Sequence, residues 1–341
     1  MGKVTAADIA KICGVSQATV SYVLNDRPDK SISPATREKI LAAAHALSYH
    51  PDAGARGMRT RKAMSIGVIV GQDSTSLSFN KTLRGIQRVL YQNGYSITLL
   101  PDEEASEQAK YVAYYLSRRI DGLLFLYMTL DLAAVELLGK YELPYLVINE
   151  AGITGCGIHL HTGLRTVIRQ CVGYCRRHDF QRIAYFSFGS AVRNPAVTRK
   201  IELLREYFLQ DYPLAALTEE VFPRGMEDEA LCSAVDEALG RLQPQVVFTP
   251  LPRLTMITEG QILRRHFELP QNIKLISLYD SWYFKELYPT VTHLEFPLSE
   301  MGEYACECLL AALGQTQPPS RGFSCSLWVG MSTLDEGGEN F

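Results

Sequence analysis

The chain lacks any long hydrophobic run. No stretch of its 341 residues approaches the roughly 20 consecutive apolar residues that a membrane-spanning helix requires. The N-terminus also lacks the pattern of a secretory signal peptide, because charged and polar residues interrupt its first apolar segment. We therefore expect a cytoplasmic protein without a membrane partner.

Paired cysteine motifs are missing as well. The sequence has eight cysteines, but none forms the CxxC pair that redox and zinc sites commonly use. Cys171 and Cys175 would share one face of a helix, and Cys306 and Cys308 lie two residues apart. This spacing favours free thiols packed as small core side chains. We expect no bound metal and no cofactor.

Signatures of the common enzyme classes are absent too. The sequence contains no GxSxG, no HExxH and no glycine-rich phosphate loop. Gly67 and Gly71 are better explained as small residues in a buried strand. Nothing in the sequence therefore favours an enzyme.

What the chain does contain is a helix-turn-helix pattern over residues 5–25. Ala10 is small where a second helix would cross the first, and Gly14 can adopt the positive φ that the turn needs. Val20 is apolar at the position between the two helices. The pattern predicts two short helices joined by a sharp turn.

Capping residues support both helices of this pattern. Thr5 and Asp8 have the spacing of a capping box, and Ser16 is a suitable N-cap for the second helix. The outward face at the start of the second helix would then carry Gln17, Ala18 and Tyr22.

A third helix and a linker follow. Ser33 and Pro34 suit the N-cap and the first position of a helix that continues to Leu47. The residues that match a known pattern in order and spacing are Val15, Ser16, Thr19, Val20, Ser21, Asn25, Thr36, Arg37, Glu38, Tyr49, Pro51, Ala55, Arg56 and Met58. This block resembles the DNA-binding headpiece and hinge of the LacI/GalR (lac repressor and galactose repressor) family.

The resemblance implies how the headpiece would bind DNA. The second helix would enter the major groove, where Gln17 can pair with adenine, Ala18 can contact a thymine methyl group and Tyr22 can reach a base edge or its sugar. Contacts to the DNA backbone would come from Thr5, Ser16, Thr19, Ser21 and Asn25.

The hinge, about residues 52–59, resembles the family segment that becomes helical only on operator DNA. Met58 occupies the position of the usual leucine wedge, and we assign Ala55 with it to the minor groove. Gly54 and Gly57 each lower helix stability by about 1 kcal/mol relative to alanine. We therefore expect the hinge to be disordered away from DNA.

Charge separates this N-terminal block from the rest of the chain. Residues 1–62 contain ten basic and five acidic residues, a net charge of +5, whereas the whole chain carries −3 and the remainder therefore −8. A basic module on an acidic body suits a protein that presents one end to phosphate. An ordinary solvated basic terminus would give the same balance.

The remaining chain is long enough for two further lobes. From residue 64 onward, apolar runs alternate with helical segments, and the alternation restarts near residue 157. Nearly continuous apolar strands between helices indicate parallel sheets covered on both faces. We therefore predict an all-α headpiece followed by an α/β body of two doubly wound, parallel-sheet lobes.

These lobes resemble the periplasmic-binding-protein-like effector domain of the same family. The matching segments include Arg84-Gly85-Ile86, Arg119-x-Asp121-Gly122, Leu143-Pro144, Arg182-Ile183-Ala184, Tyr279-Asp280 and Met301-Gly302. The implied division is a headpiece (1–50), a hinge (51–62) and an effector and dimerisation domain (63–341). With crossings near residues 161, 290 and 322, the first lobe would contain 63–161 and 290–322, and the second 162–289 and 323–341.

Several positions where the family binds its effector have changed. Ser76-Leu77-Ser78 replaces the usual Asn-Pro-aromatic, His161-Thr162 replaces Asp-Asn, and Leu251-Pro252 replaces Asn-Asp. The change indicates a pocket that is re-specialised or no longer used. The candidate effector-binding residues are Asp73, Phe79, Tyr127, His161, Arg199, Asp280, Trp282 and Phe296.

Each candidate also has a structural explanation. Arg199 and Asp280 could orient a polar ligand, but a surface ion pair would equally explain Arg199. The aromatic residues could stack on a ligand or simply pack in the core. His159 and His161 would share one face of a strand, and without a third ligand nearby a cleft-lining role is favoured over a metal site.

Together these features predict a sequence-specific DNA-binding transcriptional regulator. One headpiece is too small for tight binding, so we expect a homodimer on a pseudo-palindromic operator. The primary hypothesis is a repressor controlled by a small, sugar-like effector in the cleft between the lobes. The alternative is a regulator whose lobes serve only dimerisation, and a solute-binding protein fits the basic headpiece less well. No leucine heptad follows Ser332, so we do not expect a tetramer.

Overall fold

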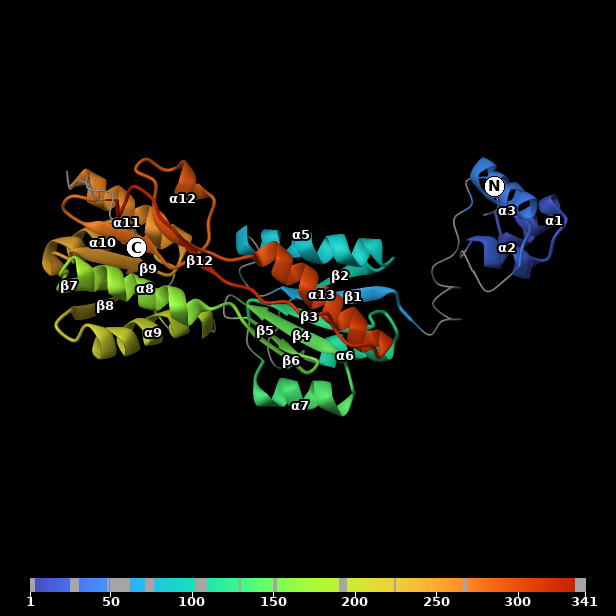
Figure 1. Cartoon of the computed structure of the whole chain (residues 1–341), viewed down its shortest axis with the longest axis horizontal. Coiled ribbons are helices and arrows are strands. Elements are labelled where there is room, and N and C mark those ends of the chain that lie inside the picture. Colours follow the sequence, from blue (N-terminus) through green and yellow to red (C-terminus); the bar gives the residue numbers. More distant parts are fainter. Residues whose placement is uncertain are drawn as a thin grey trace. The chain divides into compact units, whose positions relative to one another are not determined.

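The computed structural model describes residues 4–24, 31–47, 49, 62–70, 77–101, 109–128, 130–149, 152–189, 195–223, 225–265 and 269–334. The chain divides into two compact units, residues 1–63 and 64–341 (Figure 1). Within the described ranges, no helix is long and apolar enough to cross a lipid bilayer.

The described part of the N-terminal unit contains three helices, α1 (Ala6–Cys13), α2 (Gln17–Leu24) and α3 (Pro34–Ala46). They enclose a small core of seven buried side chains: Ile9, Ala10, Cys13, Val20, Val23, Ile40 and Ala44. Lys39 of α3 links this helix to the end of α1. Its ammonium group donates a hydrogen bond to the backbone oxygen of Cys13 at 3.0 Å.

Local capping explains where these helices begin and end. The capping box of Thr5 and Asp8 is complete, and Gly14 ends α1 in the left-handed conformation at φ 68°. The backbone N–H of Thr36 donates to the Ser33 hydroxyl at 3.2 Å, which caps α3 as predicted.

The first lobe of the second unit is built on a six-stranded sheet of order β2-β1-β3-β4-β5-β6. Its strands are β1 (Ser65–Val70), β2 (Ser96–Pro101), β3 (Gly122–Leu126), β4 (Tyr145–Asn149), β5 (Gly152–Gly155) and β6 (Ile158–His161). Helices α5 (Leu77–Gln92) and α13 (Leu298–Gly314) cover one face, and α6 (Ala109–Leu116) and α7 (Leu132–Lys140) cover the other (Figure 1).

The second lobe has a six-stranded sheet of order β12-β11-β10-β9-β7-β8. Its strands are β7 (Arg182–Phe188), β8 (Ala216–Phe222), β9 (Val246–Thr249), β10 (Lys274–Ser277), β11 (Thr292–Glu295) and β12 (Ser326–Trp328). Helices α8 (Leu164–Arg177) and α9 (Pro195–Asp211) pack on one face. Helices α10 (Asp228–Leu242) and α11 (Pro252–Arg264), with the short α12 (Tyr283–Glu286), pack on the other.

The predicted α/β architecture is confirmed, and each sheet has a parallel centre. The edges differ, because β5, β6 and β12 pair antiparallel with their neighbours. The strand β5 was not predicted, since its sequence of four residues begins and ends with glycine and carries no strand signal. The sheets are therefore mixed at their edges.

The second crossing between the lobes lies later than predicted. Strand β11 pairs in parallel with β10, Ile276 opposite Thr292, and so belongs to the second sheet. Residues 290–295 were assigned to the first lobe, and this assignment is wrong, because the chain leaves the second sheet only after Glu295 and enters the first lobe at α13. Two crossing segments lie side by side, with the N–H of Cys325 donating to the backbone oxygen of Thr162 at 2.6 Å.

Candidate functional site

The first candidate surface lies at the start of α2. Gln17 and Ala18 are exposed, and Tyr22 lies one turn later on the same side and is half-buried. Val20 and Val23 point the other way into the headpiece core. The side chains predicted to contact bases are thus turned away from the core of the headpiece.

Polar groups surround the beginning of this helix. The Ser16 hydroxyl accepts from the backbone N–H of Thr19 at 3.0 Å and lies 2.9 Å from the Thr19 hydroxyl. At α1, the Thr5 hydroxyl donates to the Asp8 carboxylate at 2.7 Å, and hydrogen bonds from Thr5 lower the pKa of Asp8. Ser21 is half-buried on α2. Contact of these groups with phosphate stays a prediction.

Four of the predicted site residues lie outside the described part of the chain. These are Asn25 of the headpiece, Ala55 and Met58 of the hinge, and Asp73 after β1.

The second candidate site lies where the first turn of α5 meets the loop after β10. The Ser78 hydroxyl donates to the Tyr279 hydroxyl at 2.9 Å. The Lys81 ammonium group lies 2.6 Å from one carboxylate oxygen of Asp280. The other oxygen of Asp280 accepts from the backbone N–H of Phe296 at 3.0 Å. Side chains of the two lobes therefore bind each other directly.

Tyr127, which follows β3, binds the same end of α5 through hydrogen bonds. Its hydroxyl lies 2.6 Å from that of Thr82 and 3.1 Å from the backbone oxygen of Ser78. The predicted residues Tyr127, Asp280 and Phe296 are thus brought together around one helix terminus.

A fully buried lysine completes this cluster from α9. The Lys200 ammonium group lies 5.4 Å from the ring centre of Tyr279 and 5.9 Å from that of Phe296. These distances are typical of cation–π contacts. We use the name cross-lobe cluster for Ser78, Lys81, Thr82, Tyr127, Lys200, Tyr279, Asp280 and Phe296.

The other predicted effector residues contact near neighbours. Arg199 forms an ion pair with Glu202, one turn along α9, with 3.0 Å between a guanidinium nitrogen and a carboxylate oxygen. The ring centres of Trp282 and Tyr283 lie 4.0 Å apart. Phe79 is buried in the core that both lobes share. An effector role for these residues stays a prediction.

The exposed His161 lies edge-on to His159 with ring centres 4.7 Å apart. Across the described ranges, no group of three or more histidine, cysteine or acidic side chains is placed to hold a metal ion. The structure thus adds no third ligand to this histidine pair.

Sequence reasoning missed Lys81 and Lys200, which resemble ordinary solvated charges on helices. Helical periodicity could have indicated that Lys200 is buried. It lies three and four residues before the buried Leu203 and Leu204, and so on the same face of the helix. Nothing in the sequence indicated that Lys81 forms an ion pair, because its partner Asp280 lies 199 positions away.

A helix-turn-helix unit followed by a two-lobed α/β body is the architecture of a class of bacterial DNA-binding regulators. Residues 5–52 match the family described as bacterial regulatory proteins, lacI family. Residues 63–160 match the periplasmic binding proteins and sugar binding domain of the LacI family, and residues 172–333 match a periplasmic binding protein-like domain. The chain belongs to the lacI family of bacterial regulatory proteins and is a DNA-binding transcriptional repressor, not an enzyme.

Similar proteins cover almost the whole chain. The ribose operon repressor of Escherichia coli is 26% identical over 325 residues, covering 92% of this chain and 94% of the relative. The transcriptional repressor PurR of Vibrio vulnificus is 24% identical over 323 residues, with coverage of 94% and 95%.

Solved structures share the fold. The lac repressor dimer bound to operator and an anti-inducer superposes with a TM-score of 0.81 at 19% identity, covering 98% of this chain and all of that one. The regulator CelR in complex with cellobiose gives a TM-score of 0.62 at 20% identity, with coverage of 97% and 100%.

Proposed function

We propose that this repressor works in the cytoplasm as a homodimer on a pseudo-palindromic operator, and that a small polar effector changes its operator affinity. The observation that carries the effector role is the cross-lobe cluster. Ser78 and Lys81 of one lobe bind Tyr279 and Asp280 of the other, so a ligand that competes for these groups changes how the lobes are held together. Such a change is what a dimer needs in order to alter the spacing of its headpieces.

The operator would be read by the exposed end of α2. We expect Gln17→Ala to reduce discrimination at one base pair per half-site by about 1–3 kcal/mol, because Gln17 can make paired hydrogen bonds to adenine. Binding measured against a library of operator variants at fixed salt tests this. Gln210→Ala, at an exposed position of α9, is the control that should keep the wild-type profile. An unchanged profile for Gln17→Ala would remove Gln17 from base readout.

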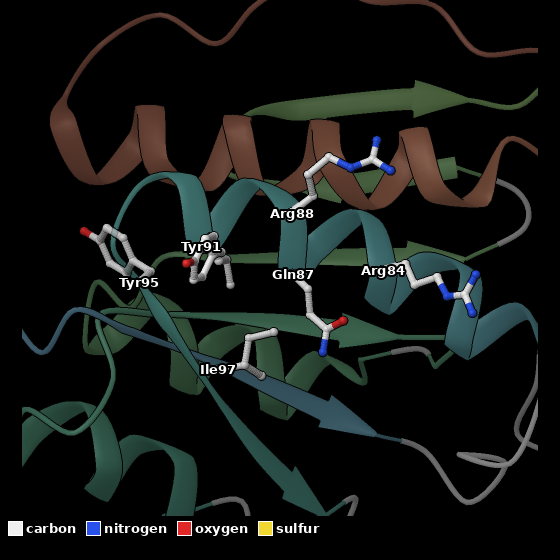
Figure 2. A pocket seen from close by; sticks show the side chains of 7 residues that line it. Arg84, Gln87, Arg88, Tyr91, Tyr95 and Ile97 are labelled. Carbon is white, nitrogen blue, oxygen red and sulfur yellow. The ribbon is translucent and has the colours of Figure 1, made fainter.

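The dimer would be formed by the outer face of α5 and β2. A surface pocket on this face is lined by Arg84, Gln87, Arg88, Leu90, Tyr91, Tyr95 and Ile97. Figure 2 shows Gln87 of α5 extending toward Ile97 of β2, whereas Arg88 points toward α13, where it pairs with Glu303. Strand β2 is an edge of its sheet, and on this lobe Tyr91 is 86% and Leu99 56% exposed. An apolar edge of this kind needs covering, and a second copy related by twofold symmetry would cover it.

We therefore expect Tyr91→Asp to convert the dimer to a monomer at micromolar concentration, because it places a charge in the centre of the proposed interface. Light scattering coupled to size exclusion measures the mass directly. Binding to a palindromic operator should weaken at least tenfold in parallel. Leu132→Asp, equally exposed but on α7 across the sheet, is the matched control and should remain dimeric (Figure 1). A dimeric Tyr91→Asp variant would place the interface elsewhere.

A further inference from the structure

Ser78 and Lys81, near the start of α5, both bind the second lobe. They are three residues apart, a spacing that places helical side chains on the same side of a helix. Their partners, Tyr279 and Asp280, are consecutive in the loop after β10. One face of α5 is therefore joined to one loop of the other lobe by a hydrogen bond and an ion pair.

Asp280 also contacts a segment that connects the lobes. One of its carboxylate oxygens lies 2.6 Å from the Lys81 ammonium group, and the other accepts from the backbone N–H of Phe296 at 3.0 Å. Phe296 lies between β11 of the second lobe and α13 of the first, and α13 packs beside α5 (Figure 1). Residues at such a crossing have to move when two lobes change their relative orientation. The Lys81–Asp280 pair is thus placed where it can oppose that movement.

Burial differs between the two partners of this pair. The Asp280 side chain is 3% exposed, and a carboxylate that is shielded from water is costly to leave without its partner. The Lys81 side chain is 38% exposed, so its ammonium group can be hydrated as soon as it leaves Asp280. The buried carboxylate therefore favours the contact, while the lysine can be released without leaving a second charge buried.

On the basis of the effector role proposed above, we propose that the contacts Lys81–Asp280 and Ser78–Tyr279 form an interlobe latch, and that the effector acts by releasing it. Both sides of the latch belong to the chain itself, so the lobes are held together without a ligand. An effector that donates a hydrogen bond to Asp280 takes the place of Lys81, whose ammonium group turns to water. The effector shifts the repressor toward the released state by its preference for that state.

A merely structural ion pair would behave differently. Its loss would lower the free energy of unfolding, but the folded repressor would keep its lobe arrangement and its operator affinity. Loss of a latch changes both of these properties in the folded protein, because the populations of the two lobe arrangements shift. Operator binding by the folded repressor therefore distinguishes the two roles.

Lys81→Met, Asp280→Asn and the double variant test the latch in the full-length repressor. Asparagine keeps an oxygen that can accept from the Phe296 N–H but removes the charge that attracts Lys81. We expect each single variant to accelerate hydrogen–deuterium exchange in residues 78–90 of α5 and to change operator affinity, both by at least about fivefold. The double variant should differ little from either single variant, because the two substitutions remove the same interaction.

Lys285→Met is the matched control. Lys285 lies 2.6 Å from Glu295 and its side chain is 40% exposed, but both partners belong to the second lobe. This variant should keep the wild-type exchange in α5 and the wild-type operator affinity. Because Lys81 is partly exposed, Lys81→Met carries the test if Asp280→Asn does not fold.

Each outcome decides between the latch and the effector role. Faster exchange together with altered operator affinity supports the latch. If exchange in α5 stays at the wild-type rate, the latch is wrong, and the effector role stands because a ligand can act through other residues between the lobes. If the effects of the two single variants multiply in the double variant, the two residues act independently and the latch is again wrong. If exchange is faster but operator affinity is unchanged, the lobes do not control operator binding and the effector role itself is rejected.

Discussion

Replacing Gly85 by alanine should destabilise the first lobe by about 3 kcal/mol or more, since overpacking at a close contact forces the backbone to move. A Cβ atom at Gly85 would lie 1.9 Å from the backbone oxygen of Ser299, and one at Gly302 would lie 2.3 Å from that of Thr82. The obstructing atoms belong to the backbone, so no side-chain rotation relieves the contact. Gly302→Ala should therefore be similarly harmful.

Urea unfolding of the purified repressor measures this effect, and the chain offers matched controls. Gly139 on α7 and Gly260 on α11 are also helical glycines, but a Cβ atom there meets nothing within 4 Å. Alanine at these positions should stabilise the protein by about 0.5–1 kcal/mol, because glycine is a poor helix former. If Gly85→Ala proved as stable as these controls, the close packing of α5 on α13 would be incorrect.

The second large effect concerns Glu259, a buried carboxyl group on α11. Burial raises its pKa to about 7, and its Oε1 atom has no hydrogen-bond partner in the described part of the structure. A pKa raised above the ordinary value of 4.5 means that the folded state prefers the protonated form. The stabilising contribution is then complete below pH 4.5 and is lost as the pH rises through 7.

Glu259→Gln should therefore stabilise the protein at pH 8 by about 3 kcal/mol, the free energy that corresponds to a pKa raised from 4.5 to about 7. At about pH 3.5, below both the folded and the unfolded pKa of Glu259, the variant and the wild type should unfold at the same denaturant concentration, because both side chains are then largely neutral. Glu237→Gln, at an exposed position of α10, is the control and should show no such pH-dependent difference. A gain of equal size at both pH values would contradict the buried titration of Glu259.

Elements that depend on residues close together in the sequence were predicted closely. The strands β7 and β9 coincide with apolar runs of the sequence, and such runs can be recognised locally. The capping box at Thr5 could also be recognised in the sequence, since its donor and acceptor lie three residues apart. The order of strands across a sheet is not local, so the short β5 and the membership of β11 in the second sheet became visible only in the structure.

The same distinction separates the two candidate sites. The end of α2 that we propose to contact DNA depends on a turn and two caps within about twenty residues, and such short-range interactions are encoded directly in the order of side chains. The cross-lobe cluster joins α5, α9 and the loops after β3, β10 and β11, and its Lys81–Asp280 pair spans 199 positions. Whether a lysine is a solvated surface charge or a buried residue depends on what packs over it. For Lys200 the packing of Tyr279 and Phe296 decided this, and only the tertiary structure brings those rings together.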